Sequence, residues 1–203
     1  MASFKETLRV QRWDDHRFYH HSRINQSLHF ISAMSFVVAY GFLFVDPPMA
    51  ALIAWCIGMT TRQSGHFFFE PKGYDHANQA THEHKEEIKV GYNLFRKVIL
   101  MGIWAILPLI LIADPTVMGL LKPYEGWTGF VRQVGAIWLC LGIAGVLFRM
   151  LQLFFIQDIQ AGLAWGFKII TDPFHDIMLY WKAPLALLRG ELIDPSIAGS
   201  RPH

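Results

Sequence analysis

Apolar residues gather in four stretches of the chain, and polar or charged residues fill the segments between them. A helix that crosses the hydrocarbon core of a membrane needs roughly 20 predominantly apolar residues. With short extensions into their flanks, the four stretches reach this length. They predict membrane-spanning helices at about 27–46, 48–69, 94–113 and 134–156.

Helix breakers separate the predicted spans. Pro47 and Pro48 end the first, because proline cannot continue a hydrogen-bonded helix, so spans one and two form a tight hairpin. Asp114 and Pro115 end the third, and the glycine-containing segment 116–133 is expected to return the chain as a loop. The aromatic and basic residues of 159–193 predict helices at the membrane interface, with a re-entrant segment at 161–170 as the alternative.

The basic residues orient this arrangement. An even number of spans places both termini on one side, and only Lys122 and Arg132 then fall on the other side. Because positively charged loops stay in the cytoplasm, both termini and the connection 70–93 are expected there. The predicted fold class is an all-α, polytopic membrane helical bundle, with about four transmembrane helices and additional interfacial helices in one domain, 1–203.

Composition supports a membrane protein and narrows its partners. The chain of 203 residues is 53% hydrophobic and only 17% charged, which is too apolar for an ordinary soluble domain of this length. Its formal net charge of +2 is small and its basic residues form no long run, so nucleic acid is excluded as a partner. The bilayer is the partner that this composition favours.

Histidines supply the candidate chemistry, because the topology places all ten on the cytoplasmic side. His29 and His66 lie at the mouths of spans one and two, where they could face each other across the hairpin. His66 and Glu70 share a helical face, as do His21, Asn25 and His29, at spacings of four. His20 could join His29 only if the chain bends near Ser22.

Neutral imidazoles bind zinc, copper, iron or nickel, and non-haem iron centres use histidines with positions left open. For several histidines the plainer interpretation competes with metal binding. His16 and His203 are expected to be solvated, as polar ends of a chain usually are. His82 and His84 could be ligands held by a loop or lie on a solvated helix face, and the same alternatives hold for His76 and His175.

Two segments carry a more specific pattern. Within 18–30 the chain reads Tyr19-His20-His21, then Asn25, then His29 at the start of the first span, and later Gly65-His66 precedes Glu70 by four residues. In this pattern, and more weakly in its tail 172–192, the chain resembles the fungal 2-hydroxy fatty acid dioxygenase family and its uncharacterised bacterial relatives.

The resemblance implies an iron(II)-dependent enzyme that uses dioxygen to shorten a 2-hydroxy fatty acid by one carbon. It nominates His20, His21, His29 and His66, with Asn25 and Glu70 in support. With the remaining clustered histidines added, the predicted site comprises the catalytic residues His20, His29 and His66, the further metal ligands His21, His82 and His84, and the supporting residues Asn25, Glu70 and His76. Arg62 or Lys72 could pair with a substrate carboxylate, and the alternative for Arg62 is an anchor at the membrane interface.

Two other functions fit the same residues. A di-iron lipid hydroxylase or desaturase would use more of the clustered histidines, although its spaced histidine boxes are absent from the sequence. A non-catalytic membrane protein could bind zinc or haem with these histidines, or respond to pH near their ordinary pKa of about 6.5. A metal count and a test for oxygen-dependent turnover separate the three.

Overall fold

The computed structural model describes residues 3–197, and within this range the chain is helical and forms no β-strand. In chain order the helices are α1 (Phe4–Tyr19), α2 (Arg23–Phe42), α3 (Pro47–Ile53), the π-helix η1 (Ala54–Met59), α4 (Thr60–Phe69), α5 (His82–Ile88), α6 (Leu94–Ala113), α7 (Gly126–Ile156), α8 (Ile159–Tyr180), α9 (Ala183–Leu188) and the 3₁₀ turn η2 (Pro195–Ile197).

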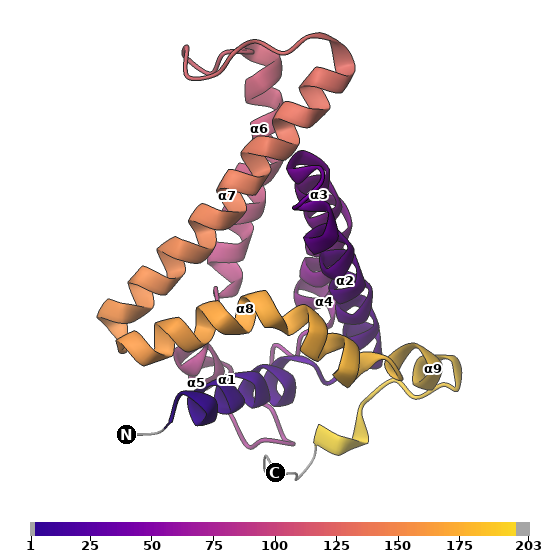
Figure 1. Cartoon of the computed structure of the whole chain (residues 1–203). Helices are drawn as coiled ribbons and strands as arrows, with labels where there is room; N and C mark the ends of the chain where they lie inside the picture. The colour runs from indigo at the N-terminus through magenta and orange to yellow at the C-terminus, as the bar shows by residue number, and fades with distance from the viewer. Residues whose placement is uncertain (1–2, 198–203) are drawn as a thin grey trace.

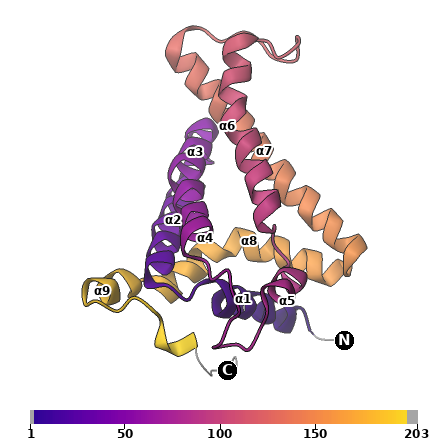
Figure 2. The ribbon, with the colours of Figure 1, turned by 180° about the vertical axis from the view of Figure 1, so that it is seen from behind.

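Two helix pairs and α8 give the molecule a triangular outline (Figure 1). The first pair is α2 against the continuous run α3–η1–α4, and the second is α6 against α7. The pairs meet at one end and spread apart towards the other, where α8 crosses between their lower ends; the view from behind shows the same arrangement (Figure 2). We call the end with α8 the base.

Polar side chains at the helix starts fix where these elements begin. Ser22 accepts a hydrogen bond from the backbone N–H of Ile24 and opens α2, and Asp46 accepts one from Met49 beside the two prolines of α3. Asn93 caps α6 and Asp158 caps α8 in the same way. These side chains satisfy N–H groups that the first helical turn leaves without a partner.

The junction at the top is held by close backbone approach and aromatic packing. Gly135 of α7 lies so near the backbone of Pro48 that a Cβ atom there would overlap with the Pro48 carbonyl oxygen. Below this contact, Trp55, Trp104 and Trp138 pack together, and the indoles of Trp55 and Trp138 each donate to a backbone carbonyl. This apolar core fixes the two pairs relative to each other.

Two helices are long and apolar enough to cross a membrane: 95–113 within α6, and α7. Few of their large apolar side chains are fully buried in the protein, and many are exposed. On α8 the exposed residues are also apolar (Ile159, Leu163, Phe167, Ile170, Phe174), whereas Lys168, Asp172 and Asp176 are buried. This pattern is the reverse of a surface helix in a soluble protein.

Some predicted boundaries need correction. The predicted span 94–113 matches α6, but α7 begins at Gly126, so the predicted loop 116–133 was too long. Gly126 does adopt a positive φ of 61°, as a turn residue would, yet the helix starts at that residue. Segment 161–170 is part of the continuous helix α8, and the alternative that it re-enters the membrane remains a prediction.

The first two predicted spans are helical, but neither α2 nor the broken run α3–η1–α4 is as clearly a spanning helix as α6 and α7. Four spans therefore remain a prediction. The first and last described residues both lie at the base (Figure 1). That this end faces the cytoplasm also remains a prediction.

Candidate metal centre

Three histidines from three separate segments meet at the base of the first helix pair. His20 follows α1, His29 lies on α2 and His66 lies on α4. Their ring centroids are 4.1 Å (His20 to His29), 4.9 Å (His29 to His66) and 5.5 Å (His20 to His66) apart. One ring nitrogen of each lies within 4.8 Å of those of the other two, and all three residues are buried. We call them the histidine triad.

The chain bends between α1 and α2, and this bend brings His20 into the triad. The helix α1 ends at Tyr19, and α2 begins after the cap residue Ser22, so His20 sits in the turn between them. The amide of Gln26 holds this turn by donating to the His20 carbonyl (2.9 Å) and to the Asp194 carboxylate (2.8 Å). Asp194, in the last described segment, therefore helps to stabilise the turn that carries His20.

Close contact between α2 and α4 brings His29 and His66 together. At Gly65 a Cβ atom would overlap with Oδ1 of Asn25 and contact the His29 ring. Asn25 is fully buried and donates to the backbone carbonyl of Tyr19 (2.8 Å), so it cannot swing aside at low cost. The Gly-His pair of the sequence motif thus has a physical basis, since glycine permits the approach that places the histidine.

Some ring nitrogens of the triad form hydrogen bonds to neighbouring residues, and others have no such partner. His66 directs Nδ1 to the Glu70 carboxylate (2.7 Å), which leaves Nε2 as its remaining donor atom. Nδ1 of His29 lies 3.7 Å from the Asp176 carboxylate. Within residues 3–197, neither ring nitrogen of His29 nor Nε2 of His20 has a hydrogen-bond partner. A buried polar atom without a partner costs about 1–3 kcal/mol, so these atoms mark a place for a ligand.

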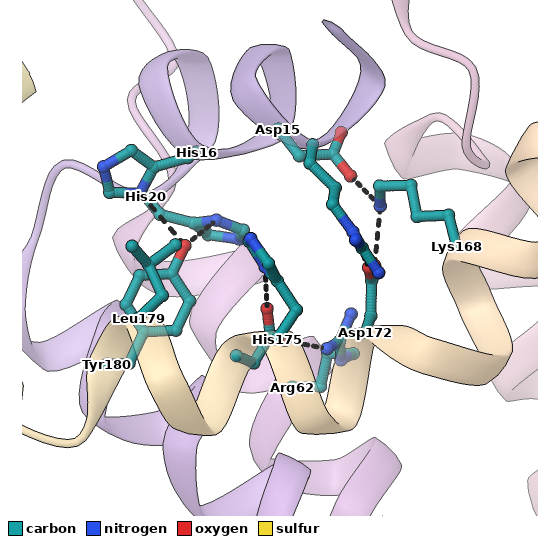
Figure 3. Close-up of a pocket in the computed structure, with 11 residues that line it drawn as sticks. Asp15, His16, His20, Arg62, Lys168, Asp172, His175, Leu179 and Tyr180 are labelled. Carbon is teal, nitrogen blue, oxygen red and sulfur yellow. Dashed lines mark hydrogen bonds and ion pairs between the residues drawn. The ribbon is translucent and has the colours of Figure 1, made fainter. Parts of the chain in front are cut away.

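Tyr180 of α8 supports the triad from the other side. Its hydroxyl lies 2.9 Å from Nδ1 of His20 and 3.1 Å from Nδ1 of His16. The hydroxyl has one proton and can donate it to only one imidazole. When the hydroxyl donates its hydrogen bond to His16, Nδ1–H of His20 donates to the hydroxyl oxygen. The lone pair of Nε2 of His20 then remains available for a metal. Figure 3 shows the hydroxyl between the two rings.

Electrostatics keep these groups in the forms that this arrangement needs. Burial and the neighbouring His29 lower the pKa of His20 well below its ordinary value, so its ring is neutral at pH 7. Burial raises the pKa of Asp176, but the Arg62 guanidinium and the nearby His175 and His29 together outweigh burial and hold that pKa well below the usual range. A neutral imidazole is the form that binds a metal. The ionised Asp176 carboxylate lies beside His29, 3.7 Å from its Nδ1.

A small polar cavity adjoins the triad between α1 and α8 (Figure 3). Its volume of about 20 Å³ is room for about one water molecule. Three cations and three carboxylates line it together with His20: Arg12, Arg62, Lys168, Asp15, Asp172 and Asp176. Lys168 pairs with Asp15 and with Asp172 (2.7 Å), so this charged network ties α1 to α8 behind the triad.

The structure does not bring the other predicted ligands into the triad. His21 precedes α2 instead of sharing its face, and its ring contacts the Arg17 carbonyl and lies 3.4 Å from Asp75. His82 and His84 lie in the first turn of α5, and His76 is exposed beside Tyr74. Among residues 3–197 the triad is the one group of three or more metal-binding side chains within reach of one ion. A metal role for these four histidines remains a prediction.

The expectation for His16 is wrong. Instead of being solvated, His16 is buried between α1 and α8, where its ring meets Tyr180. The reason is that α1 packs along α8 and is not a free polar end of the chain. His175 is half-buried and lines the cavity. His203 lies outside the described residues.

Sequence reasoning missed two residues of the site, Tyr180 and Asp176. Both belong to α8, for which the only signals were the aromatic and basic residues of 159–193 and the weak resemblance of 172–192. Arg62, which could have paired with a substrate carboxylate or served as an interfacial anchor, forms an ion pair with Asp176. The charged residues that recur at spacings of four on the largely apolar α8 (Lys168, Asp172, Asp176) are the signal that could have identified Asp176.

The donor set fits a metal ion. Three neutral imidazoles with supported orientations are a ligand set for iron, zinc, copper or nickel, and a set of three leaves coordination positions open for other ligands. Glu70 and Tyr180 each hydrogen-bond to the ring nitrogen that does not face the metal, as carboxylates and other polar groups do for metal-binding histidines in general. The residues therefore permit iron(II) without selecting it over zinc.

No family model matches the chain. No curated protein and no solved structure matches it either. The resemblance to 2-hydroxy fatty acid dioxygenases therefore remains a prediction, and functional inference depends on the geometry of the triad.

Proposed function

We propose that the protein is a membrane-bound, iron(II)-dependent dioxygenase that acts on a 2-hydroxy fatty acid or a related lipid and shortens it by one carbon. The observation that carries the proposal is the triad: three buried imidazoles whose ring nitrogens converge within 4.8 Å. Bound there, iron(II) would supply the centre at which dioxygen reacts with the lipid.

The chain's own residues have separate roles in this proposal. His20, His29 and His66 hold the metal, and Glu70 and Tyr180 fix the orientation of His66 and His20. Burial of the three rings excludes bulk water from the metal side of the site. The remaining open positions are left for dioxygen and substrate.

A membrane location suits a lipid substrate. We infer that α2 and the run α3–η1–α4 form two further spans beside α6 and α7. In support, the 20 residues of α2 extend about 30 Å, and its face with Ile31, Met34 and Val38 is exposed and apolar. The triad then lies at the membrane boundary at the base, which the charge distribution assigns to the cytoplasm.

The proposal is tested by turnover. Protein purified without a histidine tag and without oxygen is loaded with iron(II), with zinc or with no metal, and is given 2-hydroxypalmitic acid and oxygen. We expect oxygen uptake and a one-carbon-shortened product with iron alone, and neither with the His29→Ala variant. Tight zinc binding without turnover under any condition would instead favour a non-catalytic metal-binding protein.

A di-iron enzyme is less well supported by the arrangement. A second iron needs its own set of ligands, and the described part of the chain gathers one such group, with His76, His82 and His84 outside it. Two irons per chain in a metal analysis would reverse this preference.

A further inference from the structure

The segment after α9 returns to the turn between α1 and α2. We call this segment, residues 191–196, the return segment. Two backbone hydrogen bonds of 2.9 Å join it to the turn: the N–H of Arg23 donates to the Leu192 carbonyl, and the N–H of Asp194 donates to the His21 carbonyl. The two stretches run antiparallel. The backbone of the turn is therefore held by a part of the chain that is distant in sequence.

The side chain of Asp194 adds further hydrogen bonds to this pairing. Its carboxylate is buried, and Oδ2 accepts from the Arg23 guanidinium (2.9 Å) and from the Gln26 amide (2.8 Å). The other oxygen, Oδ1, accepts from the backbone N–H (2.9 Å) and the hydroxyl (2.7 Å) of Ser196. A carboxylate offers about four acceptor positions, so these contacts occupy it fully.

Gln26 connects Asp194 to His20. The Gln26 side chain is fully buried, and its amide nitrogen donates to the Asp194 carboxylate and to the His20 carbonyl (2.9 Å). The amide oxygen accepts from the Arg23 guanidinium (2.8 Å). A rotated amide would direct its oxygen at the carboxylate and at the carbonyl, where neither can donate. Asp194 therefore fixes the amide in the orientation that holds the backbone of His20.

His20 is the member of the triad that depends on such support. His29 and His66 lie within α2 and α4, whereas His20 follows the end of α1 with a non-helical backbone (φ −115°, ψ 45°). Its ring nevertheless packs 4.1 Å from the His29 ring, centroid to centroid. Metal ligands must be held to within about 0.5 Å of their working positions. The position of the turn therefore decides whether three imidazoles or two reach the ion.

We propose that Asp194 is a positioning residue of the metal centre, which acts through Gln26 to hold His20 where its imidazole completes the triad. This inference rests on the proposed function, which it deepens by assigning control of the metal affinity to the return segment. Without the Asp194 carboxylate, His29 and His66 are still held by their helices, and they bind a metal more weakly as a pair.

The affinity for zinc tests the proposal without turnover. The full chain, free of metal and in detergent, competes for zinc with a chromogenic chelator. Asp194→Ala removes all four hydrogen bonds that the carboxylate accepts. We expect this variant to bind zinc about tenfold more weakly, the lower end of the loss observed when a group that supports a metal-binding histidine is removed.

Asp114→Ala is the matched control. Asp114 is also followed by a proline and a hydroxyl residue, and its Oδ1 accepts from the N–H (2.9 Å) and the hydroxyl (2.7 Å) of Thr116, as Asp194 accepts from Ser196. It follows α6 at the end of the molecule opposite the base (Figure 1). Both variants should lower the thermal midpoint, and only Asp194→Ala should weaken zinc binding. Normal zinc binding by Asp194→Ala, or equal weakening in both variants, overturns the proposal.

A double-mutant cycle tests whether Asp194 acts through His20. In a chain that already carries His20→Ala, Asp194→Ala should cause no further loss of zinc affinity, because the ligand that it positions is absent. The absorption spectrum of cobalt(II) bound to Asp194→Ala should also shift towards that of cobalt(II) bound to His20→Ala. A further tenfold loss in the double variant would show a general effect on the fold and would overturn the proposal.

Turnover by the iron-loaded protein separates this inference from the proposed function. If the wild type binds zinc but oxidises no lipid with iron, and Asp194→Ala binds zinc more weakly, the dioxygenase proposal fails and the role of Asp194 stands. If turnover is present but Asp194→Ala binds zinc normally, the role of Asp194 fails alone. A wild-type protein that binds neither zinc nor iron overturns both.

Discussion

In α2 most residues without exposed surface are polar, among them Asn25, Gln26 and His29, whereas in α6 beyond its first turn the exposed residues are apolar, among them Ile103, Ile106 and Leu109. The base of the first helix pair has a polar interior held by specific hydrogen bonds. The second pair buries little and turns its apolar side chains outward. The difference indicates that one region is built to hold a ligand and the other to contact lipid.

The largest effect is expected from a charge placed on the exposed apolar face of α6, because it should oppose insertion of that helix into the membrane. At Ile106, near the middle of the helix and 53% exposed, a lysine would oppose membrane insertion by roughly 2.5–3.5 kcal/mol. We expect Ile106→Lys to reduce the membrane-inserted fraction in a glycosylation-mapping assay, and Val10→Lys on α1, which is also exposed, to have little effect. Normal insertion of Ile106→Lys would show that α6 does not face lipid.

Glycine substitutions sharpen the comparison between the two pairs. At Gly65 a methyl group overlaps with Asn25, and overpacking of this kind costs about 1–3 kcal/mol. At Gly102 in α6 there is nothing within 4 Å, and alanine is the better helix former. Gly65→Ala should therefore lower the thermal midpoint and the metal content, while Gly102→Ala lowers neither. Equal behaviour of the two variants would contradict the tight contact of α2 with α4.

Loss of one supporting hydroxyl should weaken metal binding without removing it. Tyr180→Phe deletes the partner of Nδ1 of His20, and loss of a group that hydrogen-bonds to a metal-binding histidine typically costs about 10- to 100-fold in metal affinity. Tyr40→Phe is the control, since the Tyr40 hydroxyl also joins α2 to α8, by donating to the Ile170 carbonyl (2.9 Å), but contacts no histidine. Unchanged affinity in Tyr180→Phe would remove Tyr180 from the site.

The smallest expected effect is on pH dependence. Burial lowers the pKa of His16 below its ordinary value, so below pH of about 6.5 the unfolded chain takes up a proton that the folded chain does not. His16 therefore destabilises the fold progressively as the pH falls below that value, by at most about 1.4 kcal/mol per pH unit. Thermal midpoints from pH 7.5 to 5 should decline less in His16→Gln than in the wild type. Replacing the exposed His84 should leave the slope unchanged.

Local sequence signals predicted the parts of the fold that depend on neighbouring residues. Asp114 and Pro115 mark the end of α6, and the predicted span 94–113 agrees with the helix. The start of α7 was missed because Gly126 and Gly129 have the composition of a turn, although only Gly126 has the backbone geometry of one. Here tertiary packing of the first turns of α7 outweighs helix propensity.

The triad was predictable because its members sit in motifs that have local causes. The turn at Ser22, the four-residue spacing of His66 and Glu70 and the hairpin at Pro47 all follow from the sequence. The partners of the triad were not predictable in this way. Tyr180 and Asp176 lie more than a hundred residues away in sequence, and the packing of α8 alone brings them to His20 and His29.

The most direct test of the central claim, that the triad binds one metal ion, is the metal content per chain of protein purified anaerobically in detergent without a histidine tag. We predict about one metal ion per chain in the wild type, and almost none in His29→Ala and His66→Ala, both still recovered from the membrane fraction. Full metal content in both variants, or no metal in the wild type after anaerobic reconstitution with iron(II) and with zinc, would contradict the claim.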